Sequence, residues 1–225
     1  MEVYSWSCDQ DPSFHIMYNF ENKKWRDLVI TEDCLSAAWS PDKRYIALSC
    51  INGYVGEIYV FDTDSDSLFQ ITNCLVNDNS CSSPAWSPDG QWLSYFQNVE
   101  KSGVHPRGIR MLNTSCLKDN DCINIQTSLI ESDSNAVWSL KNELLLSHNG
   151  VIQFMEMKKG EFVSNKQINT NIESFMYISL SPDEEYLIFT SGFDALTLYS
   201  RSHDTFKTIF ESINSIEIIG WIVIK

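Results

Sequence analysis

Residues 38–50 read AWSPDKRYIALSC, and residues 85–96 read AWSPDGQWLSYF. Related text begins twice more, as WSLKNELLLSH at Trp138 and as LSPDEEYLIFT at Leu180. A further tryptophan, Trp221, lies in an apolar stretch of the sequence. The repeat anchors are Trp39, Trp86, Trp138, Leu180 and Trp221, at successive intervals of 47, 52, 42 and 41 residues. A recurrence at this spacing indicates one structural unit used several times.

Each repeat contains four short runs rich in β-branched and aromatic residues, separated by Asp, Asn, Ser, Pro and Gly. Such runs are typical of strands joined by turns, and no long stretch has helical periodicity. Four strands for every ~40–50 residues are the signature of a β-propeller blade. We therefore predict an all-β fold, a β-propeller of four-stranded blades that occupies residues 1–225 as a single domain.

The two ends of the chain complement each other in the repeat. Residues 3–8 align with the second strand of a unit, and residues 215–221 align with the first strand. This register predicts five blades, with the ring closed by N-terminal and C-terminal strands in one blade. The alternative is a fragment of a propeller with six or more blades.

The repeated Ser-Pro-Asp predicts a turn between the first two strands of a unit, because Pro presets φ and Asp bonds nearby backbone N–H groups. Asp42, Asp89 and Asp183 are the expected turn residues. The unit that begins at Trp138 lacks the Pro and is expected to turn on Asn142. The anchor tryptophans are expected to fill space between adjacent sheets.

These motifs resemble the TolB-like propeller repeats, which are related to WD repeats. The resemblance is carried by residues 39–42, 86–90 and 180–183, with later strands matched by residues 58–62 and 68–72. It implies the propeller fold, a default role in binding a protein or glycan partner, and a periplasmic or extracellular location. No Gly-x-Ser-x-Gly elbow of a peptidase domain occurs in the chain.

The chain contains seven cysteines, many for a cytosolic protein of this length, and none of them forms a CxxC motif. The repeat register brings six together as three local disulfides, Cys34–Cys50, Cys74–Cys81 and Cys116–Cys122, and leaves Cys8 over. Disulfides would fit an oxidising compartment, periplasmic or extracellular. The alternative is a cytoplasmic protein with reduced cysteines, some of them small buried apolar residues.

The formal net charge of −14 disfavours binding to nucleic acid, because affinity for phosphate rests on Lys and Arg. The sequence contains no run of ~18 apolar residues, so we do not expect it to insert into a membrane. We expect a monomeric domain with no cofactor. The acidic turn of residues 62–66 resembles a calcium loop, but Ser67 and Asn73 stand where glycine and glutamate are required.

The longest loop between second and third strands, residues 97–108, carries Lys101, His105 and Arg107 in an otherwise acidic chain. Long loops on rigid scaffolds often bind partners, so these three residues are the predicted partner-binding surface. His15, His105 and His148 are expected at the same end of the fold. We do not expect a metal site there, because the three histidines occupy non-equivalent positions in the repeat.

The predicted function is therefore a non-catalytic binding module that presents its loop end to a protein or glycan. The alternatives are a propeller enzyme of glycosidase or lyase type, and a sub-domain of a larger exported protein. A glycosidase needs paired carboxylates about 5–10 Å apart, and no acid pair stands out by its spacing. An enzyme is therefore the weaker interpretation, and no catalytic residue is predicted.

Overall fold

The structure is a computed structural model of the chain. It describes residues 2–6, 14–19, 24–28, 33–75, 79–99, 107–119, 121–124, 128–159, 161–170, 175–191 and 195–211, the first three segments as backbone only. The chain divides into two compact units. The first comprises residues 1–86, 90–106 and 110–128, and the second comprises residues 87–89, 107–109 and 129–225.

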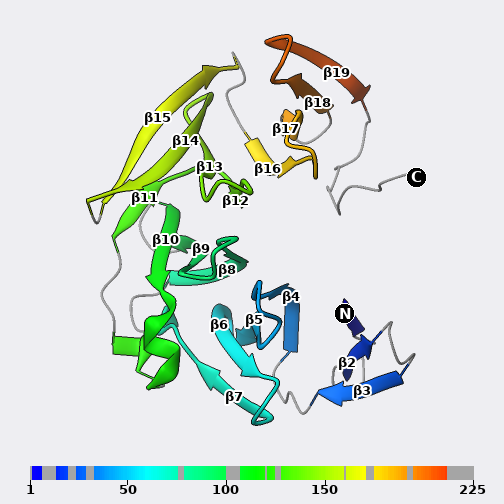
Figure 1. Cartoon of the computed structure of the whole chain (residues 1–225), viewed down its shortest axis with the longest axis vertical. Helices are drawn as coiled ribbons and strands as arrows, with labels where there is room; N and C mark the ends of the chain where they lie inside the picture. Colours follow the sequence, from blue (N-terminus) through cyan, green and yellow to red (C-terminus); the bar gives the residue numbers. More distant parts are fainter. Residues whose placement is uncertain are drawn as a thin grey trace. The chain divides into compact units, whose positions relative to one another are not determined.

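The described secondary structure consists of antiparallel strands and two short 3-10 helices (Figure 1). A three-stranded sheet contains β1 (Glu2–Trp6), β2 (Phe14–Asn19) and β3 (Lys24–Leu28). Four four-stranded sheets follow. Their strands are β4 (Asp33–Trp39), β5 (Tyr45–Asn52), β6 (Val55–Asp62) and β7 (Ser67–Gln70); β8 (Asn79–Trp86), β9 (Trp92–Val99), β10 (Gly108–Asn113) and β11 (Leu129–Glu131); β12 (Val137–Trp138), β13 (Leu144–His148), β14 (Val151–Lys158) and β15 (Glu161–Asn169); and β16 (Phe175–Leu180), β17 (Tyr186–Ser191), β18 (Ala195–Ser200) and β19 (Thr205–Glu211).

Neighbouring strands within every sheet are also neighbours in sequence, so each sheet is a simple meander. This arrangement confirms the all-β prediction and the four-stranded repeat. The 3-10 helices, η2 (Thr114–Lys118) and η3 (Cys122–Asn124), follow β10. Among the described residues, no helix is long and apolar enough to cross a membrane. The number of blades and the closure of the ring stay predictions, and residues 215–221 with Trp221 lie outside the described residues.

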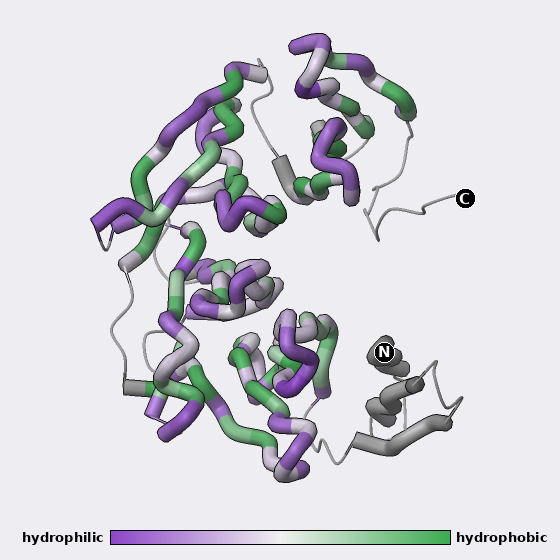
Figure 2. Tube along the Cα trace, viewed as in Figure 1, coloured by the Kyte–Doolittle hydropathy of each residue, from purple (hydrophilic) through white to green (hydrophobic). Residues whose placement is uncertain are grey.

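Apolar residues run along strands of both units (Figure 2), with strands such as β5, β6 and β13 buried over most of their length, and each unit has its own core. In the first unit, Ile58, Val60 and Leu93 are among the buried residues of one cluster. In the second unit, Phe154 and Phe189 belong to a cluster that packs the sheet β12–β15 against the sheet β16–β19. Burial of these side chains is the main favourable term in folding.

A buried serine closes the turn after the first strand of each four-stranded sheet. Ser40 Oγ donates a hydrogen bond to Asp42 Oδ1 (2.6 Å) and accepts one from Tyr45 N (2.9 Å). The serine-to-aspartate bond recurs at 2.6 Å in two further turns, in which the acceptors are Asp89 and Asp183. The three aspartates therefore act in the turns as predicted. The buried serines are Ser40, Ser87, Ser139 and Ser181.

The third residue after the serine adopts the left-handed conformation in every one of these turns. Its φ is 61° at Lys43, 71° at Gly90, 61° at Asn142 and 60° at Glu184. In the turn without Pro, Ser139 Oγ instead accepts from the backbone N–H groups of residues 141 and 143. Asn142 thus takes the turn position expected of it, because Asn tolerates this conformation better than most residues.

In the second unit, the side chain at this left-handed position also reaches the preceding turn. Asn142 Oδ1 accepts a hydrogen bond from Asp89 N (3.1 Å). The Glu184 carboxylate likewise accepts one from Leu140 N. In these two cases, one side chain from each turn therefore hydrogen-bonds to the backbone of the preceding turn.

Trp86 packs between two sheets of the first unit, as predicted for the anchor tryptophans. Its side chain is buried, and its indole Nε1 donates a hydrogen bond to the carbonyl of Ala38 in β4 (2.9 Å). Its ring stacks on that of Tyr45, with centroids 6.3 Å apart and planes inclined by 15°. The Trp thereby joins the end of β8 to the sheet β4–β7.

All three predicted disulfides are present: Cys34–Cys50, Cys74–Cys81 and Cys116–Cys122. The first joins paired residues of β4 and β5, and the other two close loops with sequence separations of 7 and 6. All six cysteines are buried, whereas Cys8 lies outside the described residues. Three disulfides favour an oxidising compartment.

We expect opposite effects from substitutions at two equivalent turn positions. Lys43→Gly should raise the free energy of unfolding by about 0.5–1 kcal/mol, because the left-handed conformation is unfavourable for a residue with a Cβ. Gly90→Ala, at a similar φ, should lower it by about the same amount. Urea unfolding of the two variants measures both changes. Changes of the same sign would contradict this explanation of the turn.

The ion pair between Arg44 and Asp62 predicts an acid-sensitive contribution to stability. The Arg44 guanidinium lies 2.9 Å from Asp62 Oδ2, and this hydrogen bond lowers the pKa of Asp62 below its ordinary value. The contribution is therefore complete above the pKa of the unfolded carboxyl, about 3.9, and is lost as pH falls through the lower folded value. Asp62→Asn should destabilise the protein at neutral pH by at most about 1 kcal/mol.

The difference between wild type and Asp62→Asn should shrink as the pH is lowered below the pKa of the unfolded carboxyl. Denaturant unfolding at a series of pH values measures it. A difference that stays constant down to the most acidic point would show that the charge of Asp62 is not what stabilises this turn.

Candidate binding site at one end of the second unit

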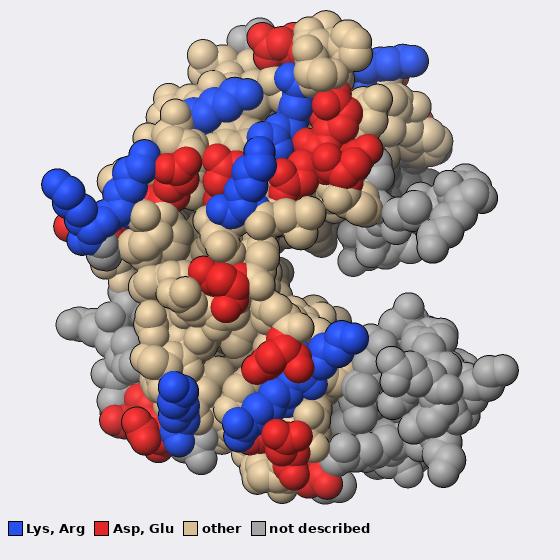
Figure 3. Space-filling model, viewed as in Figure 1, with Lys and Arg blue, Asp and Glu red and all other residues tan. Residues whose placement is uncertain are grey.

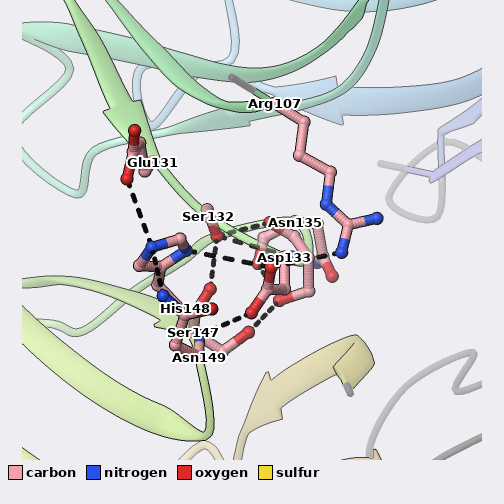
Figure 4. Close-up of polar contacts among 9 residues, drawn as sticks. Arg107, Glu131, Ser132, Asp133, Asn135, Ser147, His148 and Asn149 are labelled. Carbon is pink, nitrogen blue, oxygen red and sulfur yellow. Dashed lines mark hydrogen bonds and ion pairs between the residues drawn. The ribbon is translucent and has the colours of Figure 1, made fainter. Parts of the chain in front are cut away.

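Two connections meet at one end of the second unit and, together with Arg107 just before β10, bring four charged or ionisable side chains together (Figure 4). One connection follows β11 and contains Ser132 and Asp133; the other is the turn from His148 in β13 to Val151 in β14. Asn149 and Gly150 form this turn with φ values of 50° and 77°, the conformation that suits a two-residue hairpin. The tight turn fixes where His148 lies.

Asp133 holds the two connections together. Its backbone N–H donates to Ser147 O (2.7 Å), and its Oδ2 accepts from Asn149 N (2.7 Å). Its Oδ1 accepts a hydrogen bond from Arg107 Nη2 (3.1 Å). The Asp133 side chain is 12% exposed, whereas that of Arg107 is 50% exposed. The carboxylate is therefore a support, and the guanidinium it holds faces solvent.

His148 lies between two carboxylates. Its Nε2 is 3.2 Å from Glu131 Oε2, and its Nδ1 is 3.8 Å from Asp133 Oδ1. The Asn149 side-chain amide nitrogen also lies 2.9 Å from Nε2. The Glu131 side chain is 64% exposed, so its carboxylate remains available to a partner.

Three buried serines form the frame beneath these side chains. Ser132 Oγ lies within hydrogen-bond distance of Ser134 O (2.8 Å) and Ser147 O (3.0 Å). The hydroxyls of Ser134 and Ser147 lie 2.8 Å apart. These bonds satisfy polar groups that would be costly to bury alone. In the part of the chain that the structure describes, none of these hydroxyls is hydrogen-bonded to His148.

The structure places only part of the predicted partner-binding surface. Arg107 lies at this site, whereas Lys101 and His105 lie outside the described residues. Of the histidines considered for a metal, His148 is here; the side chains of His15 and His105 are not described. Within the described ranges, no group of three or more His, Cys, Asp or Glu side chains is arranged to hold a metal ion.

Sequence reasoning misses Glu131 and Asp133 as site residues. Both lie in the segment 126–135, which carries no recognisable motif in the sequence. Asp133 contacts residues 26 positions earlier and 16 positions later, and no local sequence pattern encodes such contacts. The acidic turn of residues 62–66 has a different role, because Asp62 binds Arg44 there.

Cationic and acidic side chains are mixed over the described surface in the view of Figure 3. Several of them form ion pairs within one unit, including Arg44–Asp62 in the first unit and Lys158–Glu156 in the second. Lys158 and Glu156 lie 2.9 Å apart and are exposed or partly exposed. Such exposed pairs contribute little to stability and serve here as neutral controls.

No protein-family model matches the chain, and no curated protein matches it. Among solved structures, the chain is similar to the crystal structure of TolB from Acinetobacter baumannii, with a TM-score of 0.57 and 12% sequence identity. The match covers 95% of this chain and 52% of that structure, so the chain spans about half its length. At this identity the likeness shows a propeller-like fold and nothing about activity.

Two carboxylates of the site should differ in their effect on stability. Asp133→Ala should lower the free energy of unfolding by about 1–3 kcal/mol, because it leaves the donors of Arg107 and Asn149 without their acceptor. Glu131→Ala removes an exposed side chain and should change it by no more than about 0.5 kcal/mol. Thermal and urea unfolding measure both. Equal effects would show that Asp133 does not support the site.

Proposed function

We propose that the chain is a non-catalytic binding module that captures a protein or glycan partner at the end of the second unit. The observation that carries the proposal is the contrast in burial between Asp133 and the groups around it. A nearly buried carboxylate binds Arg107 and the turn that carries His148, His148 in turn contacts Glu131, and the side chains of Arg107 and Glu131 are half or more exposed. These three groups offer both hydrogen-bond donors and acceptors in fixed positions, which lowers the entropy lost on binding.

The same geometry favours binding over catalysis. A serine nucleophile needs a hydroxyl bonded to the histidine, but the nearby hydroxyls are buried and bonded elsewhere. A glycosidase needs two carboxylates on either side of an open space. Here the imidazole of His148 lies between Glu131 and Asp133, and Asp133 is already bound to Arg107.

We infer that the protein works in the periplasm or outside the cell, as the three disulfides support; a cytoplasmic location is the alternative. The four four-stranded sheets, together with a three-stranded sheet at the N-terminus, support a five-bladed ring completed by the C-terminal segment. A part of a larger exported propeller is the alternative. A monomer that binds neither nucleic acid nor a membrane remains our proposal, on the strength of the net charge of −14.

The binding proposal is tested with labelled protein on a glycan array and on a peptide array. The double variant Arg107→Ala/Glu131→Ala should weaken the strongest signal about tenfold or more, because polar anchors of this kind cost over ~1 kcal/mol when removed. The matched control is Lys158→Ala/Glu156→Ala, which removes an ion pair from the same unit without changing the net charge.

The control should bind like wild type. Unchanged binding by the Arg107/Glu131 double variant would contradict the assignment of the site. A wild-type protein that retains no probe on either array would contradict the proposed partner classes.

A further inference from the structure

The first unit exposes four large apolar side chains at one end of the sheet β4–β7. Leu35 is 70% exposed, Ile51 39%, Tyr54 97% and Leu75 48%. Single exposed apolar residues are ordinary, but several at one place mark interaction surfaces. We call this set the Tyr54 surface.

The strand register places three of the four residues together. Leu35 is the extra residue at an irregularity between Cys34 and Ser36 in β4. Ile51 lies at the end of β5, paired with Asp33 on one side and with Gly56 on the other. Tyr54 follows directly in the turn between β5 and β6, with Gly53 at a φ of 69°.

A buried carboxylate brings the fourth residue to the same end. Glu57 in β6 is fully buried, and its Oε1 accepts a hydrogen bond from Leu75 N (2.9 Å). Its Oε2 accepts from Cys74 N (3.0 Å) and from the Thr72 hydroxyl (2.5 Å). Because Glu57 is also paired with Cys50, next to Ile51, the segment that carries Leu75 is held beside the other three residues.

Two disulfides fix the segments that bear this surface. Cys34–Cys50 joins the residues next to Leu35 and Ile51, and Cys74–Cys81 closes the loop that begins with Leu75. Side chains mounted on a rigid backbone lose less entropy when they bind a partner. The cross-links therefore hold exposed apolar groups in place, where a flexible loop would let them turn inward.

The charge near this surface is negative. Asp33 is exposed, and its backbone pairs with that of Ile51. Among the first-unit residues whose side chains the structure describes, the cations lie elsewhere. They are Lys43 and Arg44 in the turn at the opposite end of β4 and β5, Arg110, which bonds to Gln97, and Lys118 at the end of η2.

We propose that the Tyr54 surface binds a segment of a partner protein that carries apolar side chains together with Lys or Arg. The apolar groups would pack on Tyr54 and the aliphatic side chains, and the cations would face Asp33. Tyrosine is among the residues that most often dominate the energy of interfaces. The surface shares no residue with the site at Arg107, so it is a second interaction surface.

The chemistry of the surface disfavours two other occupants. A glycan would leave its hydroxyl groups without partners against Leu35, Ile51 and Leu75, which is costly when they are buried. A second copy of this chain carries the same net charge of −14 and would be repelled. A cationic peptide segment meets neither objection.

The test is selection of random displayed peptides on the wild-type protein with intact disulfides, followed by calorimetry with one enriched synthetic peptide. Enriched peptides should combine Lys or Arg with Leu, Ile, Phe or Trp. Tyr54→Ala/Leu75→Ala should weaken the peptide about tenfold or more. Added salt should weaken it several-fold, because attraction between exposed charges is screened.

Three controls make the result decisive. The Leu140→Ala variant removes a leucine of the second unit that is more exposed than Leu75, and it should bind like wild type. Arg107→Ala/Glu131→Ala should also keep the peptide, so failure of the proposed site leaves this surface testable. Both substituted side chains of the Tyr54/Leu75 variant are exposed, and circular dichroism verifies its fold.

The proposal is overturned by any of three outcomes. The first is selection without enrichment of cationic and apolar residues. The second is evidence that the peptide binds elsewhere: either the Tyr54/Leu75 variant binds the peptide as tightly as wild type, or the Arg107/Glu131 variant loses it. The third is concentration-dependent self-association in sedimentation that disappears with Tyr54→Ala, which would assign the surface to a second copy.

Discussion

A buried serine hydroxyl ends the first strand of each four-stranded sheet, and the local order of the chain depends on it. In the turn at Ser40, the hydroxyl both donates to the Asp42 carboxylate and accepts from Tyr45 N. A buried hydroxyl left without partners would cost about 1–3 kcal/mol, so the turn has one favourable geometry. That geometry sets the register of the first hairpin. Trp39 pairs with Ile46 in that register, and the irregularity at Leu35 then shifts the pairing by one residue, so that Cys34 lies opposite Cys50 and can form the disulfide.

The sequence therefore predicts well whatever depends on contacts within one repeat. The turn aspartates, the left-handed Asn142, the strand order and three disulfides all arise from residues fewer than about twenty positions apart, and a repeat displays such contacts several times. The candidate site is different. Charge alone predicts Arg107, and its acceptor Asp133 lies on another strand connection, so the ion pair exists only once the sheets are formed. Closure of the ring likewise depends on contacts between residues far apart in sequence, because it would join the two ends of the chain.

The two units support their exposed side chains by different means. All three disulfides lie in the first unit, and the sequence after residue 122 contains no cysteine. There, cross-links and the Glu57 carboxylate hold apolar groups. In the second unit, Asp133 and the buried serines hold polar and charged groups by hydrogen bonds alone. An unpaired carboxylate is costly whether it is fully buried, as Glu57 is, or nearly buried, as Asp133 is, and both offset that cost by accepting at least two hydrogen bonds.

Glu57 and Asp133 thus support connections, and the side chains around them form the two proposed surfaces. A carboxylate that accepts several backbone N–H bonds joins segments whose own backbone would otherwise have unpaired donors, as Glu57 does for Cys74 and Leu75. Each such carboxylate ties a connection to its sheet through hydrogen bonds. Rigid connections can keep a tyrosine or an arginine in solvent, and this is what separates the two proposed surfaces from ordinary exposed loops. The repeat supplies the frame, and Glu57 in β6 and Asp133 after β11 hold the connections on which the two proposed surfaces lie.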